Sequence, residues 1–270
     1  MATLVHVPYR VDVGHAGHDA FDRLVELGAI DIELSLDGDL AAVMPDHVAP
    51  EQIARALGVG HVTVSAARGR DAESVWILRP RPVRIGRLQI VPVDHQPGRD
   101  TLRLIDADAF GTGLHPTTAL CVEELERLVD MAPPRAVLDV GTGSGVLALS
   151  ALLMGVPRAL GIDTDREALH VAAENARINR LEHRLELARG GPETVTGAWP
   201  LVLANVLAAP LIDMAPELVR RVGHHGQLVL SGIPSSVEGD VDRAYGRLGM
   251  RRVRATSRRG WVALLLQASW

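Results

Sequence analysis

The first 67 residues change repeatedly between the two periods that distinguish strands from helices. Alternating apolar and polar positions predict strands, and apolar positions three or four residues apart predict helices. In chain order the pattern predicts a strand, a helix, two strands, a helix and a strand, over residues 4–13, 17–27, 29–36, 40–44, 49–57 and 61–67. This order is the split βαβ, or ferredoxin-like, arrangement.

From about residue 100 the pattern alternates between short apolar strands and amphipathic helices. The series runs from the strand "AVLDVG" at 136–141 to a closing hairpin at 251–268. Such alternation predicts a mainly parallel sheet with helices on both faces. We therefore expect an α/β chain in three parts, which are a small α+β ferredoxin-like domain at 1–70, a Pro- and Arg-rich connector at 71–100 and a doubly wound, Rossmann-like domain at 101–270.

Composition narrows the class of protein. The chain has 270 residues, 47% of them hydrophobic, which is enough for a sizeable core, and its formal charge of −5 argues against a general nucleic-acid binder. The single cysteine, Cys121, excludes an internal disulfide and a cysteine-rich zinc site, so no metal is expected. No leader or long apolar run is evident, which indicates a cytoplasmic protein without a membrane partner.

The stretch "VLDVGTGSGVLALSA" predicts a strand, a glycine turn and a helix. Gly141, Gly143 and Gly145 allow positive φ and the close approach of a ligand. The dinucleotide fingerprint needs a further glycine where Val146 stands, and a Walker loop needs a lysine, which this chain lacks. Both phosphate-binding interpretations are therefore weakened, and a tight turn without a ligand remains the alternative.

Asp163 ends the next predicted strand, 22 residues after Gly141. A carboxylate at that position lies beside the glycine turn and can accept both hydroxyl groups of a ribose. S-adenosylmethionine fits better than NAD, because its sulfonium is a cation and the cleft carries Asp139 and Asp163. A solvated acid at a strand end is the alternative. Asn205 ends the fourth strand and could bridge cofactor and substrate, unless it is a helix cap.

The stretch "DADAFGTGLHPTTA" at 106–119 precedes the first strand of this sheet. Pro116 suits a helix start, and Thr117 or Thr118 lies near the cap. We expect the stretch to close over the cofactor as a lid, with Phe110 shielding the methyl group. A rigid brace is the alternative. His115 is expected to fix the loop rather than to act as a base.

These segments resemble the ribosomal protein L11 methyltransferase family, the PrmA type. The resemblance rests on "AFGTGLHPTTALCVEEL", "VLDVGTGSGVLALSA", "GIDTDREALHVAAENARIN", "LANVLAAPLIDMAPEL", "LVLSGI" and "WVALLL", which span residues 109–266. The chain departs from the family pattern at Asp106-Ala107-Asp108, where Asp-Pro-Gly is usual, and at Arg258-Arg259-Gly260-Trp261, where Glu-Gly-Glu-Trp is common.

The resemblance implies a class I S-adenosylmethionine-dependent methyltransferase domain behind a small substrate-recognition domain. It implies cofactor contacts at Thr118, Gly141, Asp163 and Asn205, and the full expected set is Phe110, Thr112, Thr117, Thr118, Gly141, Thr142, Gly143, Asp163 and Asn205. Asn205 is the one candidate catalytic residue, and no general base is evident.

The activity expected from the resemblance is methylation of lysine or N-terminal amines on a large-subunit ribosomal protein, by a monomer that does not read nucleic acid directly. Three alternatives stay open. They are methylation of another protein, such as an electron-transfer flavoprotein subunit, methylation of a small molecule, and cofactor binding without catalysis.

Overall fold

A computed structural model gives the structure of the chain. It describes residues 9–15, 17, 19–29, 31–34, 39–45, 48–66, 82–105, 115–258 and 260–270. Among these residues, no helix is long and apolar enough to cross a membrane.

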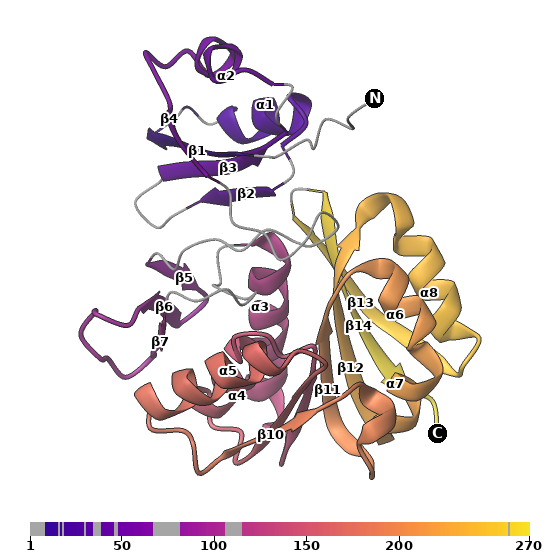
Figure 1. Ribbon diagram of the computed structural model, residues 1–270. Coiled ribbons are helices and arrows are strands. Elements are labelled where there is room, and N and C mark those ends of the chain that lie inside the picture. Colours follow the sequence, from indigo (N-terminus) through magenta and orange to yellow (C-terminus); the bar gives the residue numbers. More distant parts are fainter. Residues whose placement is uncertain are drawn as a thin grey trace, which may run out of the picture.

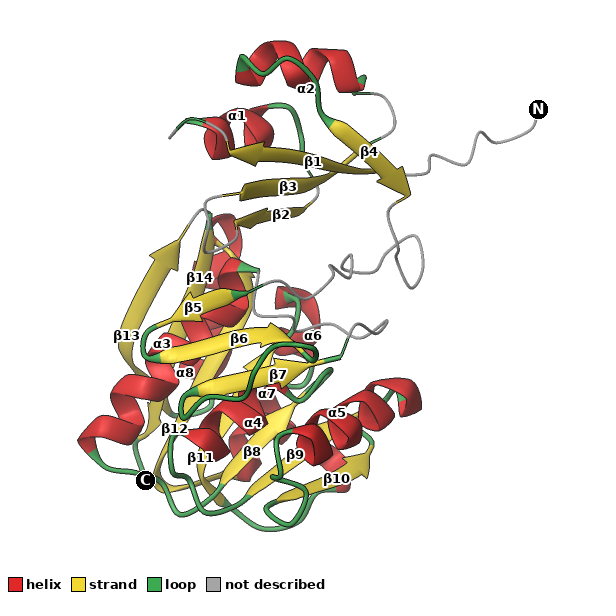
Figure 2. Cartoon of the chain, turned by 90° about the vertical axis from the view of Figure 1, so that its left-hand side faces the viewer, coloured by secondary structure: helices red, strands yellow, loops and turns green. Residues whose placement is uncertain are grey.

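The N-terminal part forms a four-stranded sheet with two helices on one face (Figures 1 and 2). The elements are β1 (Tyr9–His15), α1 (Ala20–Glu26), β2 (Asp31–Leu34), β3 (Asp39–Met44), α2 (Pro50–Leu57) and β4 (Thr63–Ala66). The strand order is β2-β3-β1-β4, and every neighbouring pair is antiparallel. Its own core includes Val11, Leu24 and Ile53. The predicted ferredoxin-like arrangement is confirmed, because the order and the strand directions both match it.

A seven-stranded sheet forms the larger part, with strand order β10-β9-β8-β11-β12-β14-β13. Its strands are β8 (Val137–Val140), β9 (Ala159–Asp163), β10 (Leu185–Arg189), β11 (Trp199–Asn205), β12 (Val222–Pro234), β13 (Met250–Arg258) and β14 (Trp261–Ala268). The first five pair in parallel, and β14 runs antiparallel to both of its neighbours. The predicted doubly wound, mainly parallel sheet is confirmed.

Helices cover both faces of this sheet (Figure 1). One layer contains α3 (Pro116–Met131), α4 (Val146–Leu153) and α5 (Arg166–Ile178), and the other contains α6 (Ala208–Asp213), α7 (Ala215–Arg221) and α8 (Glu238–Gly246). Short 3-10 helices lie at Pro192–Thr194 and Ser235–Val237. Along β11, Leu201 and Leu203 pack in the core beside α3, α4 and α5, whereas Val202 and Ala204 pack in the core beside α6, α7 and α8. A strand buried on both faces therefore reads as a continuous apolar run.

Residues 83–104, which include most of the predicted connector, form a small sheet (Figure 2). Its strands are β5 (Val83–Ile85), β6 (Leu88–Pro92) and β7 (Thr101–Leu104), with β5 antiparallel and β7 parallel to β6. Ile90 and Leu102 belong to the same core as α3, α4 and α5. The segment "VRIGRLQIVP" has an almost unbroken alternation, because the turn at Gly86 and Arg87 has only two residues, yet it forms two strands.

Two further elements differ from the pattern. The strand β10 was not predicted, because "LELAR" carries only two leucines among polar residues. The segment "PLIDMAPELVRRV" at 210–222 has a helical pattern, but the structure divides it at Met214 into α6 and α7. Pro216 lies at the start of α7, where its missing N–H leaves no helical bond unmade.

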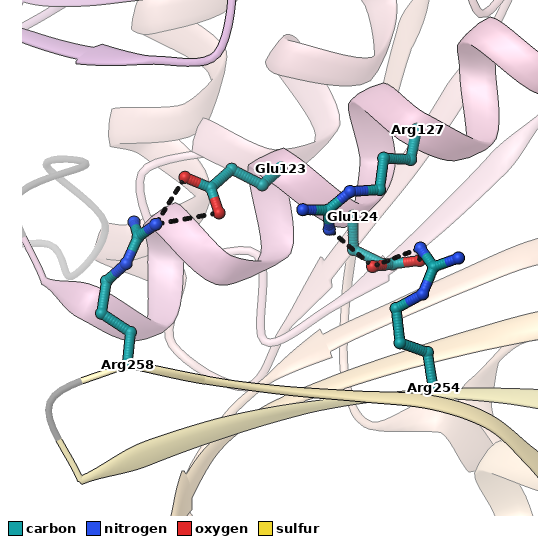
Figure 3. Close-up of polar contacts among 5 residues, drawn as sticks. All are labelled: Glu123, Glu124, Arg127, Arg254 and Arg258. Atoms are coloured by element: carbon teal, nitrogen blue, oxygen red, sulfur yellow. Dashed lines mark hydrogen bonds and ion pairs between the residues drawn. The ribbon is translucent and has the colours of Figure 1, made fainter.

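Ion pairs join α3 to the edge strand β13 (Figure 3). Glu124 is almost fully buried and pairs with Arg254 at 3.1 Å and with Arg127 at 3.0 Å. Glu123 pairs with Arg258 at 2.9 Å. A buried carboxylate is tolerated only when it is paired. These contacts hold α3 beside the sheet, so that its N-terminus meets the carboxyl ends of the strands.

Candidate functional site

The glycine turn joins β8 to α4 at the carboxyl edge of the sheet. Gly141, Gly143 and Gly145 have φ values of 71°, 55° and 81°, and Gly145 caps α4. A β-carbon at Gly141 would lie 2.6 Å from Cγ1 of Val206. The turn therefore needs glycine for two reasons, which are left-handed backbone and the close approach of the neighbouring β11–α6 loop.

Asp163 lies at the end of β9 and binds this turn directly. Its Oδ2 accepts the backbone N–H of Gly143 at 2.9 Å, and its Oδ1 accepts that of Asp165 at 3.0 Å. The side chain is not a solvated acid, since two backbone groups hold it in place. Asp163 is half-buried at the carboxyl edge of the sheet, the place where an acid can accept ribose hydroxyl groups.

Asp139, at the end of β8, was not among the predicted site residues. It is buried, and its Oδ2 accepts the hydroxyl of Thr142 at 2.7 Å and the N–H of Ala148 at 3.1 Å. Burial raises the pKa of Asp139 to about 6, these two hydrogen bonds oppose the rise, and the charge of Asp163 adds to it. Its Oδ1 is buried and has no hydrogen-bond partner among the described residues. An acid inside the strand, two residues before the first glycine, was the available signal.

Asn205 ends β11 and faces the first turn of α3. Its Nδ2 donates to the hydroxyl of Thr118 at 3.4 Å, and its Oδ1 is buried without a hydrogen-bond partner among the described residues. The cap of α6 is Leu207, so Asn205 is not the helix cap that the sequence left as an alternative. A buried acceptor that has no hydrogen-bond partner among the described residues is an unusual feature, because buried polar groups are nearly always paired.

Val206 is held between two glycines. Its side chain lies against Gly141, and its carbonyl oxygen would be 2.2 Å from a β-carbon at Gly232, where φ is 82°. Gly232 follows Ser231, which pairs with Asn205 across β11 and β12. The loop after Asn205 is thus packed against both the glycine turn and the end of β12.

The N-terminus of α3 completes the site. His115 caps the helix, because its Nδ1 accepts the backbone N–H of Thr117 at 3.3 Å and lies 2.6 Å from the Thr117 hydroxyl. The imidazole also contacts the edge of Trp261, with ring centroids 4.9 Å apart. Ser231 donates to the carbonyl of Thr117 at 3.1 Å. The cap is therefore His115, and its ring holds the chain as predicted.

The structure brings most of the predicted site residues to one edge. Two sides can be distinguished there. We call Asp139, the turn at 141–145 and Asp163 the cofactor side, and Asn205, Thr117, Thr118 and Ser231 the acceptor side. Thr142 lies on the cofactor side, where its hydroxyl donates a hydrogen bond to Asp139. Phe110 and Thr112, with the predicted lid, lie outside the described residues.

Comparisons with known proteins agree on one family. The family model for the ribosomal protein L11 methyltransferase, PrmA, matches residues 37–269. The protein of that name from Pelobacter propionicus is 38% identical over 218 residues, which cover 77% of this chain and 70% of the relative. The one from Geobacter sulfurreducens is 41% identical over 209 residues, which cover 75% and 68%.

A solved structure agrees with these relatives. The crystal structure of the ribosomal protein L11 methylase from Lactobacillus delbrueckii subsp. bulgaricus is 31% identical and superimposes with a TM-score of 0.64, covering 70% of this chain and 99% of that one. The glycine turn, Asp163 and Asn205 all lie inside the matched range of the family model. The chain therefore belongs to the PrmA family of ribosomal protein L11 methyltransferases.

Proposed function

We propose that this chain transfers the methyl group of S-adenosylmethionine to lysine or N-terminal amines of ribosomal protein L11. One observation carries the proposal. The Oδ1 of Asn205, which has no hydrogen-bond partner among the described residues, and the cofactor side meet at the same edge of the sheet, and Val206, the residue after Asn205, lies against Gly141. The relatives that share this family are named for the same protein substrate.

The cofactor side suits S-adenosylmethionine. Asp163 would hold the ribose, and the backbone of the turn at 141–145 would pass along the ligand. When bound, S-adenosylmethionine supplies a methyl group that its sulfonium has already activated. The carboxylates Asp139 and Asp163 favour the positive charge of that sulfonium.

The acceptor side suits an amine that must be neutral to react. A lysine amine has an unperturbed pKa of about 10.4, and burial among neutral groups lowers it. Asn205, Thr118 and Ser231 carry no charge, so they do not stabilise the ammonium form. The open Oδ1 of Asn205 would accept an amine N–H and direct the nitrogen lone pair toward the methyl group. Alignment and desolvation then provide most of the rate.

The three parts of the chain divide this work. Residues 1–70 would bind the protein substrate and residues 101–270 would carry out the transfer. Of the predicted connector at 71–100, the part from residue 83 onward packs in the core of the transfer domain. Every cofactor signal lies after residue 105, which supports the division. We further infer a cytoplasmic monomer, since newly made ribosomal proteins are cytoplasmic and the proposed site is built from a single chain.

The test is incubation with radiolabelled S-adenosylmethionine and undermethylated ribosomal proteins, followed by mass spectrometry of the labelled band. Label on L11 amines is the expected result. Label only on another protein would contradict the substrate. Binding of S-adenosylmethionine without any label would instead indicate a module that holds the cofactor and does not use it.

A shortened chain tests the division of labour. A chain starting at residue 79 keeps β5, β6 and β7, which belong to the core of the larger part. It should bind S-adenosylmethionine with unchanged affinity and should not methylate L11. Full methylation by this chain would contradict a recognition role for residues 1–70.

A further inference from the structure

Two asparagines on α5 hold the chain at the end of β7. Asn179 accepts the N–H of Arg103 at 2.9 Å and donates to the carbonyl of the same residue at 2.7 Å. Asn175, one helical turn earlier, accepts the N–H of Ile105 at 2.9 Å. Side chains four residues apart lie on the same helix face. Both asparagines therefore tether residues 103–105, which lead directly into the stretch at 106–114.

Only Asn175 also reaches the glycine turn. Its Nδ2 donates to the carbonyl oxygen of Ser144 at 2.9 Å, and the side chain is 0% exposed. Ser144 lies between Gly143, whose N–H binds Asp163, and Gly145, which caps α4. One amide thus connects the turn of the cofactor side with the start of the stretch at 106–114.

This double contact needs an amide. The oxygen must accept from a backbone N–H while the nitrogen donates to a backbone carbonyl, and a carboxylate or an apolar side chain cannot do both. Asn175 and Ser144 are buried and Ile105 is partly buried, so at least the carbonyl of Ser144 would lose its partner inside the protein rather than in water.

We propose that Asn175 is a positioning residue that sets the conformation of the glycine turn and links it to the segment entering residues 106–114. Binding of the cofactor at the turn then reduces the opening of residues 103–105, through the same amide. The inference rests on the cofactor site proposed above. Asn179 holds the same segment to the same helix and has no contact with the turn, so it provides a matched comparison.

The test compares Asn175→Leu with Asn179→Leu in the full chain. Leucine has the same branching as asparagine, is larger, and cannot form these hydrogen bonds. Asn175→Leu removes the bonds to Ile105 and Ser144, and Asn179→Leu removes the bonds to both backbone groups of Arg103 and to the carbonyl of Asn175. The probe is S-adenosylhomocysteine, measured by calorimetry, with circular dichroism to verify folding. We expect Asn175→Leu to weaken binding about tenfold, which corresponds to ~1.4 kcal/mol, and Asn179→Leu to change it by less than about twofold.

Amide exchange gives a second readout that a general loss of stability would not produce. In the wild type the probe should slow exchange at both Arg103 and Ile105, and in Asn179→Leu it should slow exchange at Ile105. In Asn175→Leu the Arg103 amide still bonds to Asn179, yet it should no longer respond to the probe. If a leucine variant does not fold, the pair Asn175→Ser and Asn179→Ser serves the same comparison.

Equal affinities in the two variants, or equal losses, would overturn the proposal. So would a response of Arg103 to the probe that survives in Asn175→Leu. A wild-type chain that does not bind S-adenosylhomocysteine would contradict the proposed function and this inference together. Wild-type binding with equal variants would contradict this inference alone.

Discussion

The cofactor side and the acceptor side of the site differ in charge. The cofactor side contains two carboxylates, Asp139 and Asp163, and backbone N–H groups hold each of them in place. The acceptor side contains an amide and three hydroxyl groups, and its central acceptor, the Oδ1 of Asn205, has no hydrogen-bond partner among the described residues. The two sides lie against each other at Val206.

This difference corresponds to the two reactants. A sulfonium is a permanent cation, so fixed negative charge beside it favours binding. An attacking amine has to lose its proton, so carboxylates around it would favour the unreactive ammonium form. The separation of charge along one sheet edge thus allows one site to hold a cation and to receive a neutral nucleophile.

Replacing Asn205 by alanine should have the largest effect on activity, because it removes the central acceptor of the acceptor side. Loss of one preorganised polar group at a reaction centre typically lowers kcat by about 10²–10³. We expect a fall of that size in methylation of L11, with affinity for S-adenosylhomocysteine falling less than about tenfold. Steady-state kinetics and calorimetry measure the two quantities. A large loss of affinity with normal kcat would show that Asn205 binds the cofactor rather than the amine.

The change Gly232→Ala tests whether the acceptor side depends on its packing against Val206. The new β-carbon would lie 2.2 Å from the Val206 carbonyl oxygen, so the loop after Asn205 must shift. A displacement of about 1 Å near a reaction centre lowers turnover by about 10². Gly197→Ala is the control, because it has a similar φ of 85° and no atom within 4 Å. Equal activity of the two variants would exclude this packing effect.

Asp163→Ala should act on the cofactor side. Hydrogen bonds to a charged group contribute about 1.5–3 kcal/mol, so affinity for S-adenosylhomocysteine should fall by about tenfold to a hundredfold. With saturating cofactor, kcat should recover most of its value. Unchanged affinity in a folded variant would show that the ribose lies elsewhere.

The effect of pH on Asp139 concerns stability rather than catalysis. Its folded pKa of about 6 lies above the ordinary value of 3.8, so the folded state binds the proton more tightly. The stability that this tighter proton binding contributes is fully present below pH 4. It amounts to roughly 2–3 kcal/mol and is lost as the pH rises through 6. Asp139→Asn keeps an acceptor for Thr142 and Ala148 and should remove that loss.

Urea unfolding at pH 4.5 and at pH 7.5 measures this difference. The free energy of unfolding of Asp139→Asn, relative to that of the wild type, should be larger at pH 7.5 than at pH 4.5, because only the wild type loses stability as the pH rises. A constant difference between the two pH values would mean that Asp139 does not titrate in this window.

Much of the site could be predicted from the chain. The glycine turn and Asp163 follow strands with clear patterns, and the carboxyl ends of neighbouring parallel strands meet at one edge. The family, the fold class and the S-adenosylmethionine dependence are confirmed. The roles assigned to individual residues stay predictions. The sequence placed Asp139 in the cleft but not among the ligand contacts, and its bonds to Thr142 and Ala148 could be seen only in the structure.

The sequence by itself determined most of the elements and their order, because strand and helix periods and turn residues are local properties of the chain. It also determined the family, through motifs that keep their spacing. Only the tertiary structure decided which groups pair across distance. Gly232 lies against Val206, Asn175 forms hydrogen bonds to Ile105 and Ser144, and Asn205 bonds to Thr118. These contacts join segments far apart in the chain, and the packing of the three layers sets their distances.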